Sequence, residues 1–162
     1  MSRWSTWRNT DLVQDKELSS FGIYEIRMVD GREQPLPVSR IGGIDEDGIV
    51  YIGGAGYSTS RTLAQRIREF QRKSGGHSGR YTYRLMHDVL GVVSKRAFFD
   101  DKLQYRAMRM PGADAEMLKQ EEVETLARYF TRYGELPPCN SSFPKWRLLV
   151  ERVHRNLERV RR

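Results

Sequence analysis

Residues 21–29 read FGIYEIRMV, and residues 49–53 read IVYIG. In the first stretch apolar residues alternate with other residues, apart from an irregularity near Tyr24, and this pattern predicts a strand. The second stretch is rich in β-branched and aromatic residues, which predicts another strand. Prolines and glycines between the two stretches predict a loop at residues 30–37, and residues 38–44 can add a short strand.

Downstream, helical patterns alternate with an extended one. After a glycine-rich turn, Ser60 can cap a helix whose apolar residues recur at spacings of four and three, at Leu63, Ile67 and Phe70. A second helix is expected at residues 81–89. A strand is expected at residues 103–110, where the proline and glycine that follow would end it.

The C-terminal third is expected to be mostly helical. Asp114 is a typical cap for a helix that runs to Tyr133, and Gly134 is its expected terminator. Two prolines make residues 135–140 irregular. Pro144 lies near the start of a last helix with one apolar stripe, formed by Trp146, Leu149, Val150, Val153, Leu157 and Val160.

These patterns predict an α+β, sandwich-like domain at residues 20–143, with a small central antiparallel three-stranded sheet flanked by helices. Residues 1–19 form an N-terminal extension with two tryptophans and no clear period. Residues 144–162 form a basic amphipathic helix, which we expect to pack on the domain or on a partner.

Composition excludes several classes of protein. The chain has 162 residues, a formal charge of +7 and a pI near 9.7. Its only cysteine, Cys139, excludes an intramolecular disulfide and a cysteine-based zinc site. The apolar runs fall far short of the roughly 20 residues that span a bilayer, and the N-terminus lacks a signal-type stretch. We therefore expect a cytoplasmic protein without membrane contact.

The positive charge is concentrated in two segments. Residues 60–109 hold 12 Lys and Arg against 4 Asp and Glu, and residues 144–162 hold 7 against 2. Clustered basic charge is the usual electrostatic footprint of a protein that binds nucleic acid. The sequence therefore favours a polyanionic partner, and DNA in particular.

The strings Gly-Ile-Tyr at residues 22–24 and Tyr-Ile-Gly at residues 51–53 stand on consecutive predicted strands. In this order they resemble the GIY-YIG nuclease superfamily. The family pattern continues with a Leu-x-x-Arg step on the first helix, which Leu63 and Arg66 match. The resemblance covers residues 21–140 and implies the fold of these nucleases.

The family also has a glutamate on the inner face of a later helix, for which Glu121, Glu122 and Glu124 compete. At about 100° per residue, Glu122 borders the expected buried face, whereas Glu124 points nearly opposite and Glu121 lies on the polar side. We therefore prefer Glu122, although all three can be surface charges. The expected buried face is formed by Val123, Leu126, Phe130 and Tyr133.

The resemblance implies a Mg²⁺-dependent DNA endonuclease in which Mn²⁺ substitutes for Mg²⁺. It assigns Tyr24 and Tyr51 as a pair that acts as, or is hydrogen-bonded to, the general base. Arg66 would clamp the scissile phosphate, and Glu122 would bind the metal ion. A phenol has a reference pKa near 10, so the metal ion and the arginine would have to lower it.

Other residues are candidates for contact with substrate. Gly53 either allows close approach of a phosphate or belongs to a flexible turn. Arg61, Arg72 and Lys73 belong to a solvated or DNA-facing surface. Asn140 matches the downstream asparagine of the family, and it either anchors the chain or contacts substrate.

The chain departs from the family pattern at Phe70, where many members have histidine or lysine one helical turn after the arginine. The glycine-rich residues 74–80 include His77, which can approach the site from a loop. A surface loop that closes the helix is the other interpretation of this segment.

Three functions fit the sequence. The first is the metal-dependent endonuclease. The second is a non-catalytic nucleic-acid-binding module on the same fold, and the third is a basic subunit that docks on a partner. A homodimer through the C-terminal helix is compatible with each.

Overall fold

The computed structural model describes residues 4–14, 16–57, 60–71, 77–83, 102–140 and 146–160. Residues 78–83 form a short helix that begins before the expected one, whose residues 84–89 lie outside the described part. No helix within the described ranges is long and apolar enough to cross a membrane. The other elements are β1 (Arg8–Asn9), a 3-10 turn (Thr10–Leu12), β2 (Gly22–Met28), β3 (Val38–Arg40), β4 (Gly43–Asp45), β5 (Ile49–Ala55), α1 (Leu63–Gln71), β6 (Leu103–Arg109), α3 (Ala115–Tyr133) and α4 (Trp146–Val160).

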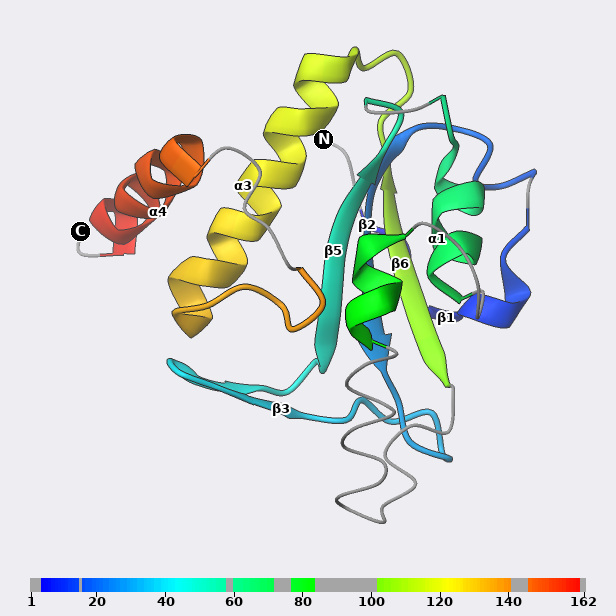
Figure 1. Ribbon diagram of the computed structural model, residues 1–162, viewed down its shortest axis with the longest axis horizontal. Helices are drawn as coiled ribbons and strands as arrows, with labels where there is room; N and C mark the ends of the chain where they lie inside the picture. The colour runs from blue at the N-terminus through cyan, green and yellow to red at the C-terminus, as the bar shows by residue number, and fades with distance from the viewer. Residues whose placement is uncertain are drawn as a thin grey trace.

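The fold is α+β around an antiparallel sheet with strand order β1-β6-β2-β5. The expected three-stranded sheet is wrong by one strand, because residues of the N-terminal extension pair with β6 as a two-residue edge strand. Helix α1 and residues 78–83 lie on one face of the sheet, and α3 lies on the other (Figure 1). Helix α4 packs outside α3.

A bulge in the pairing of β2 with β5 orients the second tyrosine. Ile26 pairs with Tyr51, but Arg27 pairs with Ile49, so Val50 is an extra residue. Val50 and Tyr51 consequently both join the core under α1, although successive strand residues usually point to opposite faces. The irregularity expected near Tyr24 is wrong, because Tyr24, Ile26 and Met28 alternate regularly into the core under α1 and the extra residue lies on β5.

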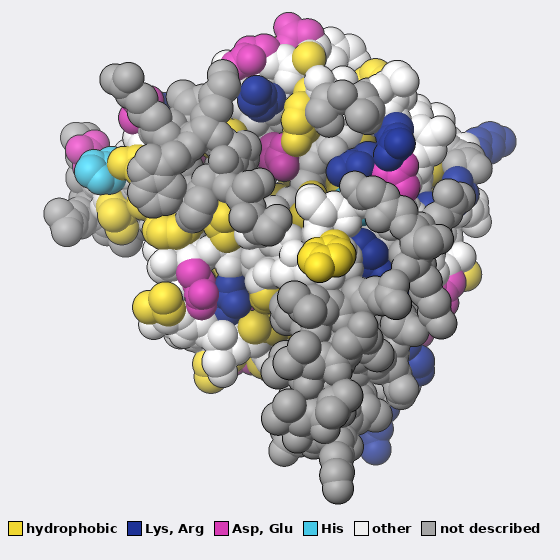
Figure 2. Space-filling model, viewed as in Figure 1, with side chains coloured by type: hydrophobic (Ala, Val, Ile, Leu, Met, Phe, Trp, Pro, Cys, Tyr) yellow, Lys and Arg dark blue, Asp and Glu magenta, His cyan; other side chains and the backbone are white. Residues whose placement is uncertain are grey.

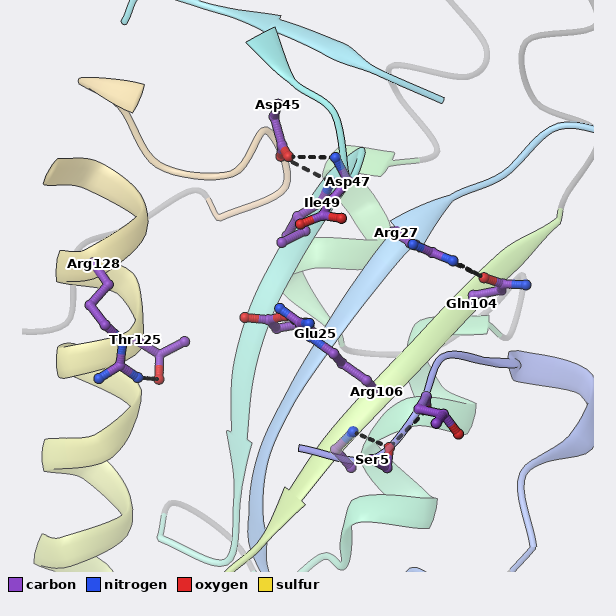
Figure 3. Close-up of polar contacts among 12 residues, drawn as sticks. Ser5, Glu25, Arg27, Asp45, Asp47, Ile49, Gln104, Arg106, Thr125 and Arg128 are labelled. Atoms are coloured by element: carbon purple, nitrogen blue, oxygen red, sulfur yellow. Dashed lines mark hydrogen bonds and ion pairs between the residues drawn. The ribbon is translucent and has the colours of Figure 1, made fainter. Parts of the chain in front are cut away.

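The short strand expected at residues 38–44 is a separate β-hairpin, because the chain reverses at Ile41 and Gly42, between the paired residues Arg40 and Gly43. The fully buried Asp45 fastens this hairpin to α3. Its carboxylate accepts hydrogen bonds from the hydroxyls of Tyr129 at 2.8 Å and Tyr133 at 3.3 Å. Asp45 also binds the backbone of the turn that leads into β5 (Figure 3).

Side-chain caps set the start of both central helices. Helix α1 is capped by Thr62 and not by Ser60: the Thr62 hydroxyl accepts from the Gln65 backbone N–H, and the Gln65 side chain accepts from the Thr62 N–H. In α3 the Asp114 carboxylate accepts from the backbone N–H three residues on, as expected. Gly134 ends α3 with a left-handed φ of 73°, which confirms its expected role.

The N-terminal extension packs on the α3 side of the sheet through its two tryptophans. The Trp7 ring lies 4.3 Å from the guanidinium carbon of Arg27 and 4.7 Å from that of Arg106. The Trp4 ring lies 5.1 Å from the same atom of Arg106. Arg106 in turn forms an ion pair with the buried Glu25 (Figure 3). These cation–π contacts hold the extension in place.

Helix α4 agrees with the amphipathic helix expected from the sequence. Val153 packs against the core that α3 shares with the sheet. Arg152 forms a 3.5 Å ion pair with Glu124 of α3. Leu157, further along the stripe, is 40% exposed. The side chains of Trp146, Leu149 and Val160 lie outside the described part.

Candidate functional site

Tyr24 and Tyr51 lie on neighbouring strands, β2 and β5, with their ring centroids 5.9 Å apart. Both side chains belong to the core under α1, and both are buried. The two motif tyrosines of the sequence are thus brought together, Tyr24 by the alternation of β2 and Tyr51 by the bulge.

His77 joins the two tyrosines from the segment that follows α1. Its Nε2 lies 2.8 Å from the Tyr24 hydroxyl oxygen, and its ring lies edge-on to Tyr51 at 4.9 Å. Phe70 packs against the same histidine ring at 5.2 Å. His77 is 1% exposed, and its Nδ1 has no hydrogen-bond partner among the described residues. The structure thus agrees with the interpretation in which His77 approaches the two tyrosines, and not with a surface loop that closes the helix.

Two glycines make room for the Tyr51 ring. A Cβ at Gly53 would lie 2.5 Å from Tyr51 Cε1 and 3.0 Å from the Tyr24 hydroxyl oxygen. A Cβ at Gly79 would lie 2.5 Å from the other side of the Tyr51 ring. A side chain at either position would therefore push the rings apart, so these glycines act in packing, while approach of a phosphate to Gly53 stays a prediction.

Arg66 projects from α1 and is mostly buried, with a side chain 18% exposed. Its guanidinium forms a 2.9 Å ion pair with Glu69, one turn later, and Arg61 forms a 2.6 Å ion pair with the same carboxylate. Burial raises the pKa of Tyr24, Tyr51 and Glu122, and the positive charge of Arg66 opposes the shift at each of the three. Arg72 and Lys73 lie outside the described residues.

Glu122 is the glutamate of α3 that faces this cluster. It is 6% exposed and lies within the buried stripe, not at its border, because the stripe runs through Tyr129 and Phe130 is only partly buried. Glu121 and Glu124 are paired with arginines instead, at 3.2 Å and 3.9 Å from Arg128, and Glu124 also with an arginine of α4.

Tyr57 is a member of the site that the sequence did not suggest. Its hydroxyl donates a hydrogen bond to Glu122 Oε2. Tyr57 lies just after β5, and its ring packs over Gly54. A further aromatic residue beside the glycines of the second motif was the one available signal, but only the tertiary fold shows that α3 passes there.

Asn140 anchors the chain. Its Oδ1 accepts from the Ile52 backbone N–H at 3.0 Å, and its Nδ2 donates to the Ile52 carbonyl at 2.7 Å. Both halves of the amide are thus bonded to β5, which matches the structural role weighed for this residue. Contact between Asn140 and substrate stays a prediction.

Burial determines the protonation of the site. It raises the pKa of Tyr51 to about 12 and raises that of Tyr24 well above its usual value, although Arg66 opposes both shifts. The charge of Arg66 alone therefore does not bring about the lowered phenol pKa that a tyrosine base requires. Burial and the charges of Arg66 and Arg61 lower the pKa of His77 to about 3, so this histidine is neutral at pH 7.

A metal ion at this site would have one buried carboxylate available to it, that of Glu122. Within the described ranges no group of three or more histidine, cysteine, aspartate or glutamate side chains could hold a metal ion. Mg²⁺ often binds proteins through one or two carboxylates and keeps several waters. Glu122 supplies such a carboxylate. Its pKa is raised by burial, but the hydrogen bond from Tyr57 and the charges of Arg66 and Lys119 favour the ionised form.

The described surface in Figure 2 carries Lys and Arg side chains interspersed with acidic and apolar ones, not gathered in one patch. The groups that could perform chemistry lie in the buried cluster, whose members come from β2, β5, α1, α3 and residues 57 and 77. No family model matches the chain, and no curated protein or solved structure matches it either.

Proposed function

We propose that the chain is a divalent-metal-dependent DNA endonuclease that hydrolyses phosphodiester bonds by a GIY-YIG type mechanism. The observation that carries this proposal is the buried contact of Tyr24, Tyr51 and His77 beside Arg66 and Glu122. Hydrolysis of a phosphodiester needs an activated water, a cation on the phosphoryl oxygens and relief of charge on the leaving oxygen. The cluster has a group suited to each need.

Arg66 is suited to bind the scissile phosphate. In the free protein its partner is the Glu69 carboxylate, which it shares with Arg61. A phosphate has the same sign of charge and accepts the same paired hydrogen bonds from a guanidinium. The substrate would thus replace Glu69 as the partner of Arg66.

Tyr24 and His77 form a proton relay in this proposal. We assign the acceptor role to His77 Nε2, because the neutral imidazole has one acceptor nitrogen and Tyr24 lies at hydrogen-bond distance. As water attacks phosphorus, its proton passes to the Tyr24 oxygen and the Tyr24 proton passes to Nε2. The bond from phosphorus to the leaving oxygen breaks, and that oxygen takes a proton from solvent.

Glu122 is the residue that would hold Mg²⁺ or Mn²⁺. Such an ion supplies Lewis-acid polarisation of the phosphoryl oxygens and neutralises charge at the leaving oxygen. Tyr51, packed on Tyr24 and His77, keeps the relay in position. The basic segments at residues 60–109 and 144–162 favour DNA as the polyanion.

The test is incubation of the purified protein with plasmid, branched and single-stranded DNA, in Mg²⁺, Mn²⁺ or EDTA. We expect nicking that requires the metal ion and that disappears in Glu122→Gln, while DNA binding persists. Glu116→Gln is the matched control, because Glu116 is an exposed residue on the first turn of the same helix. Cleavage by Glu122→Gln at the wild-type rate would contradict the assigned metal ligand.

The second candidate is a non-catalytic module that binds nucleic acid. The ion pair of Arg66 with Glu69 favours it, because a neutralised arginine is less available to a phosphate. Metal-independent DNA binding without cleavage of any of these substrates would select this module over the enzyme.

A further inference from the structure

The loop after β5 and helix α3 meet through one hydrogen bond between side chains. The Tyr57 hydroxyl donates to Oε2 of Glu122. Glu122 is almost fully buried, and Tyr57 is partly buried. A glutamate in a helix has several rotatable bonds, so a donor on one of its oxygens restricts the orientation of the whole carboxylate.

Gly54 is what lets these two side chains meet. A Cβ at Gly54 would lie 2.5 Å from Tyr57 Cε1 and 3.2 Å from Glu122 Oε2. Because Gly54 has no side chain, the Tyr57 ring and the Glu122 carboxylate can both lie against the backbone of β5 and contact each other. Glycine here has no positive φ, so close approach and not backbone conformation explains the residue.

We propose that Tyr57 is a positioning residue for the metal ion: its hydroxyl occupies Glu122 Oε2 and so presents Oε1 to a divalent cation. This inference rests on the proposed function, because it assumes that Glu122 is the metal ligand. Hydrogen bonds to the ligands of metal ions commonly change metal affinity by about 10- to 100-fold when they are removed. Tyr57 does not touch the reacting atoms and acts through Glu122.

The Tyr57 hydroxyl could instead compete with the cation for the Glu122 carboxylate, and the two roles predict different results. A hydroxyl that merely filled the place of the cation would compete with it, and its removal would tighten binding. A hydroxyl that orients the carboxylate helps the cation, and its removal weakens binding. The sign of the change in metal affinity therefore decides between the two roles.

The experiment titrates ¹⁵N-labelled protein with Mn²⁺ alone and follows paramagnetic broadening of the amide signals of Gly54 and Glu122, which detects weak binding without any turnover. In wild type we expect saturable broadening at both amides. In Tyr57→Phe the Mn²⁺ concentration at half-saturation should rise by about 10-fold or more. The Mg²⁺ concentration for half-maximal cleavage should rise similarly, while the rate at saturating Mg²⁺ changes much less.

The matched control is Tyr129→Phe. Tyr129 also donates to a buried carboxylate, that of Asp45, from the same helix as Glu122. This variant should lose stability but keep the wild-type Mn²⁺ titration. A change in Mn²⁺ affinity equal to that of Tyr57→Phe would show a general loosening of α3 and would overturn the positioning role.

Gly54→Ala offers a second route to the same state, because the added methyl group would displace the Tyr57 ring from Glu122. It should weaken Mn²⁺ binding as Tyr57→Phe does. Unchanged or tighter binding in Tyr57→Phe, with binding lost in Glu122→Gln, would overturn the inference and leave the proposed function standing. Equal binding in wild type and Glu122→Gln would overturn both.

Discussion

The face of the sheet under α3 and the face under α1 both bury polar side chains. The two faces differ in how far these side chains have hydrogen-bond and ion-pair partners. Under α3, Glu25 is paired with Arg106, and Arg27 donates two hydrogen bonds, of 3.0 and 2.7 Å, to Gln104. Trp4 and Trp7 cover both guanidinium groups. Under α1, by contrast, His77 keeps a buried nitrogen without a partner in the described part of the chain.

This difference suggests which buried polar residues stabilise the fold and which could take part in a reaction. Buried charges that already have all their partners have nothing left to offer a substrate, and they hold the extension and the strands together. A buried imidazole that shares one tyrosine hydroxyl can still exchange partners, and so can an arginine that is paired with the Glu69 carboxylate. We therefore expect substitutions in the ion pair and hydrogen bonds of Glu25, Arg106 and Arg27 to change stability, and substitutions of Arg66 and the residues around His77 to change reaction rate.

The largest effect is expected on the α3 face. Arg106→Ala leaves Glu25 buried without its ion pair and removes the cation between the tryptophans, so the free energy of unfolding should fall by about 3 kcal/mol. Urea denaturation measures it, with Arg109→Ala, at the exposed end of the same strand, as control. Cleavage per folded molecule should be unchanged. Lost cleavage with unchanged stability would reverse the roles of the two faces.

On the α1 face, Arg66→Ala should lower the single-turnover cleavage rate by at least about 100-fold, because it removes a group that stabilises transition-state charge. Arg68→Ala is the control on the same helix, since Arg68 donates instead to the Val13 carbonyl. Single-turnover kinetics at saturating protein measure both. Similar rates for the two variants would mean that Arg66 has no special part in the reaction.

The neutral His77 makes stability depend on pH. Its pKa is lowered from 6.5 to about 3 by burial and by the charges of Arg66 and Arg61. Below pH 6.5 the unfolded chain binds a proton at this residue that the folded protein does not, so acid destabilises the fold. The free energy of unfolding should fall by about 1.4 kcal/mol per pH unit, or about 2 kcal/mol from pH 6.5 to 5. Urea denaturation across this range should give a shallower slope for His77→Gln, and equal slopes would contradict a neutral buried histidine.

The smallest effect concerns α4, which is layered outside α3. If its basic side tracks the DNA backbone, replacing Arg155, Arg159, Arg161 and Arg162 together by glutamine should flatten the slope of log affinity against log salt by about two or more. Cleavage at saturating protein should stay unchanged. An unchanged slope would leave α4 as a brace or a dimer contact, and sedimentation of the same variant tells which of the two it is.

Local patterns predicted the regular elements well. The strands that carry Tyr24 and Tyr51 and the helix from Asp114 to Gly134 follow from alternation and capping residues, whose effects act within one turn or strand. The helical period also favoured Glu122 over its two neighbours. Contacts between distant segments were not predictable in this way, because no local pattern encodes them: β1 pairs across the sequence with β6.

The same limit applies to the site. His77 was suggested only through the resemblance, because Phe70 stands where many GIY-YIG nucleases have histidine or lysine. Tyr57 and Glu69 were missed, since each matters through a partner, Glu122 or Arg66, and nothing in their own sequence context marks them. Burial raises the pKa of both phenols, and the depth of that burial is a property of the folded core that no local pattern encodes.

The amide of Asn140 has a consequence for how copies of this chain behave toward one another. Strand β5 ends the sheet, and an unpaired strand edge is a template on which another chain can add a strand. The Asn140 side chain is hydrogen-bonded to both the N–H and the carbonyl of Ile52, and the Cys139 N–H donates to the carbonyl of Val50. The Asn140 side chain thus makes the hydrogen bonds that a neighbouring strand would make, and so prevents another chain from pairing with β5 at this position. Asn140→Ala should accordingly be detected first by light scattering, as association that grows with protein concentration, before any loss of cleavage.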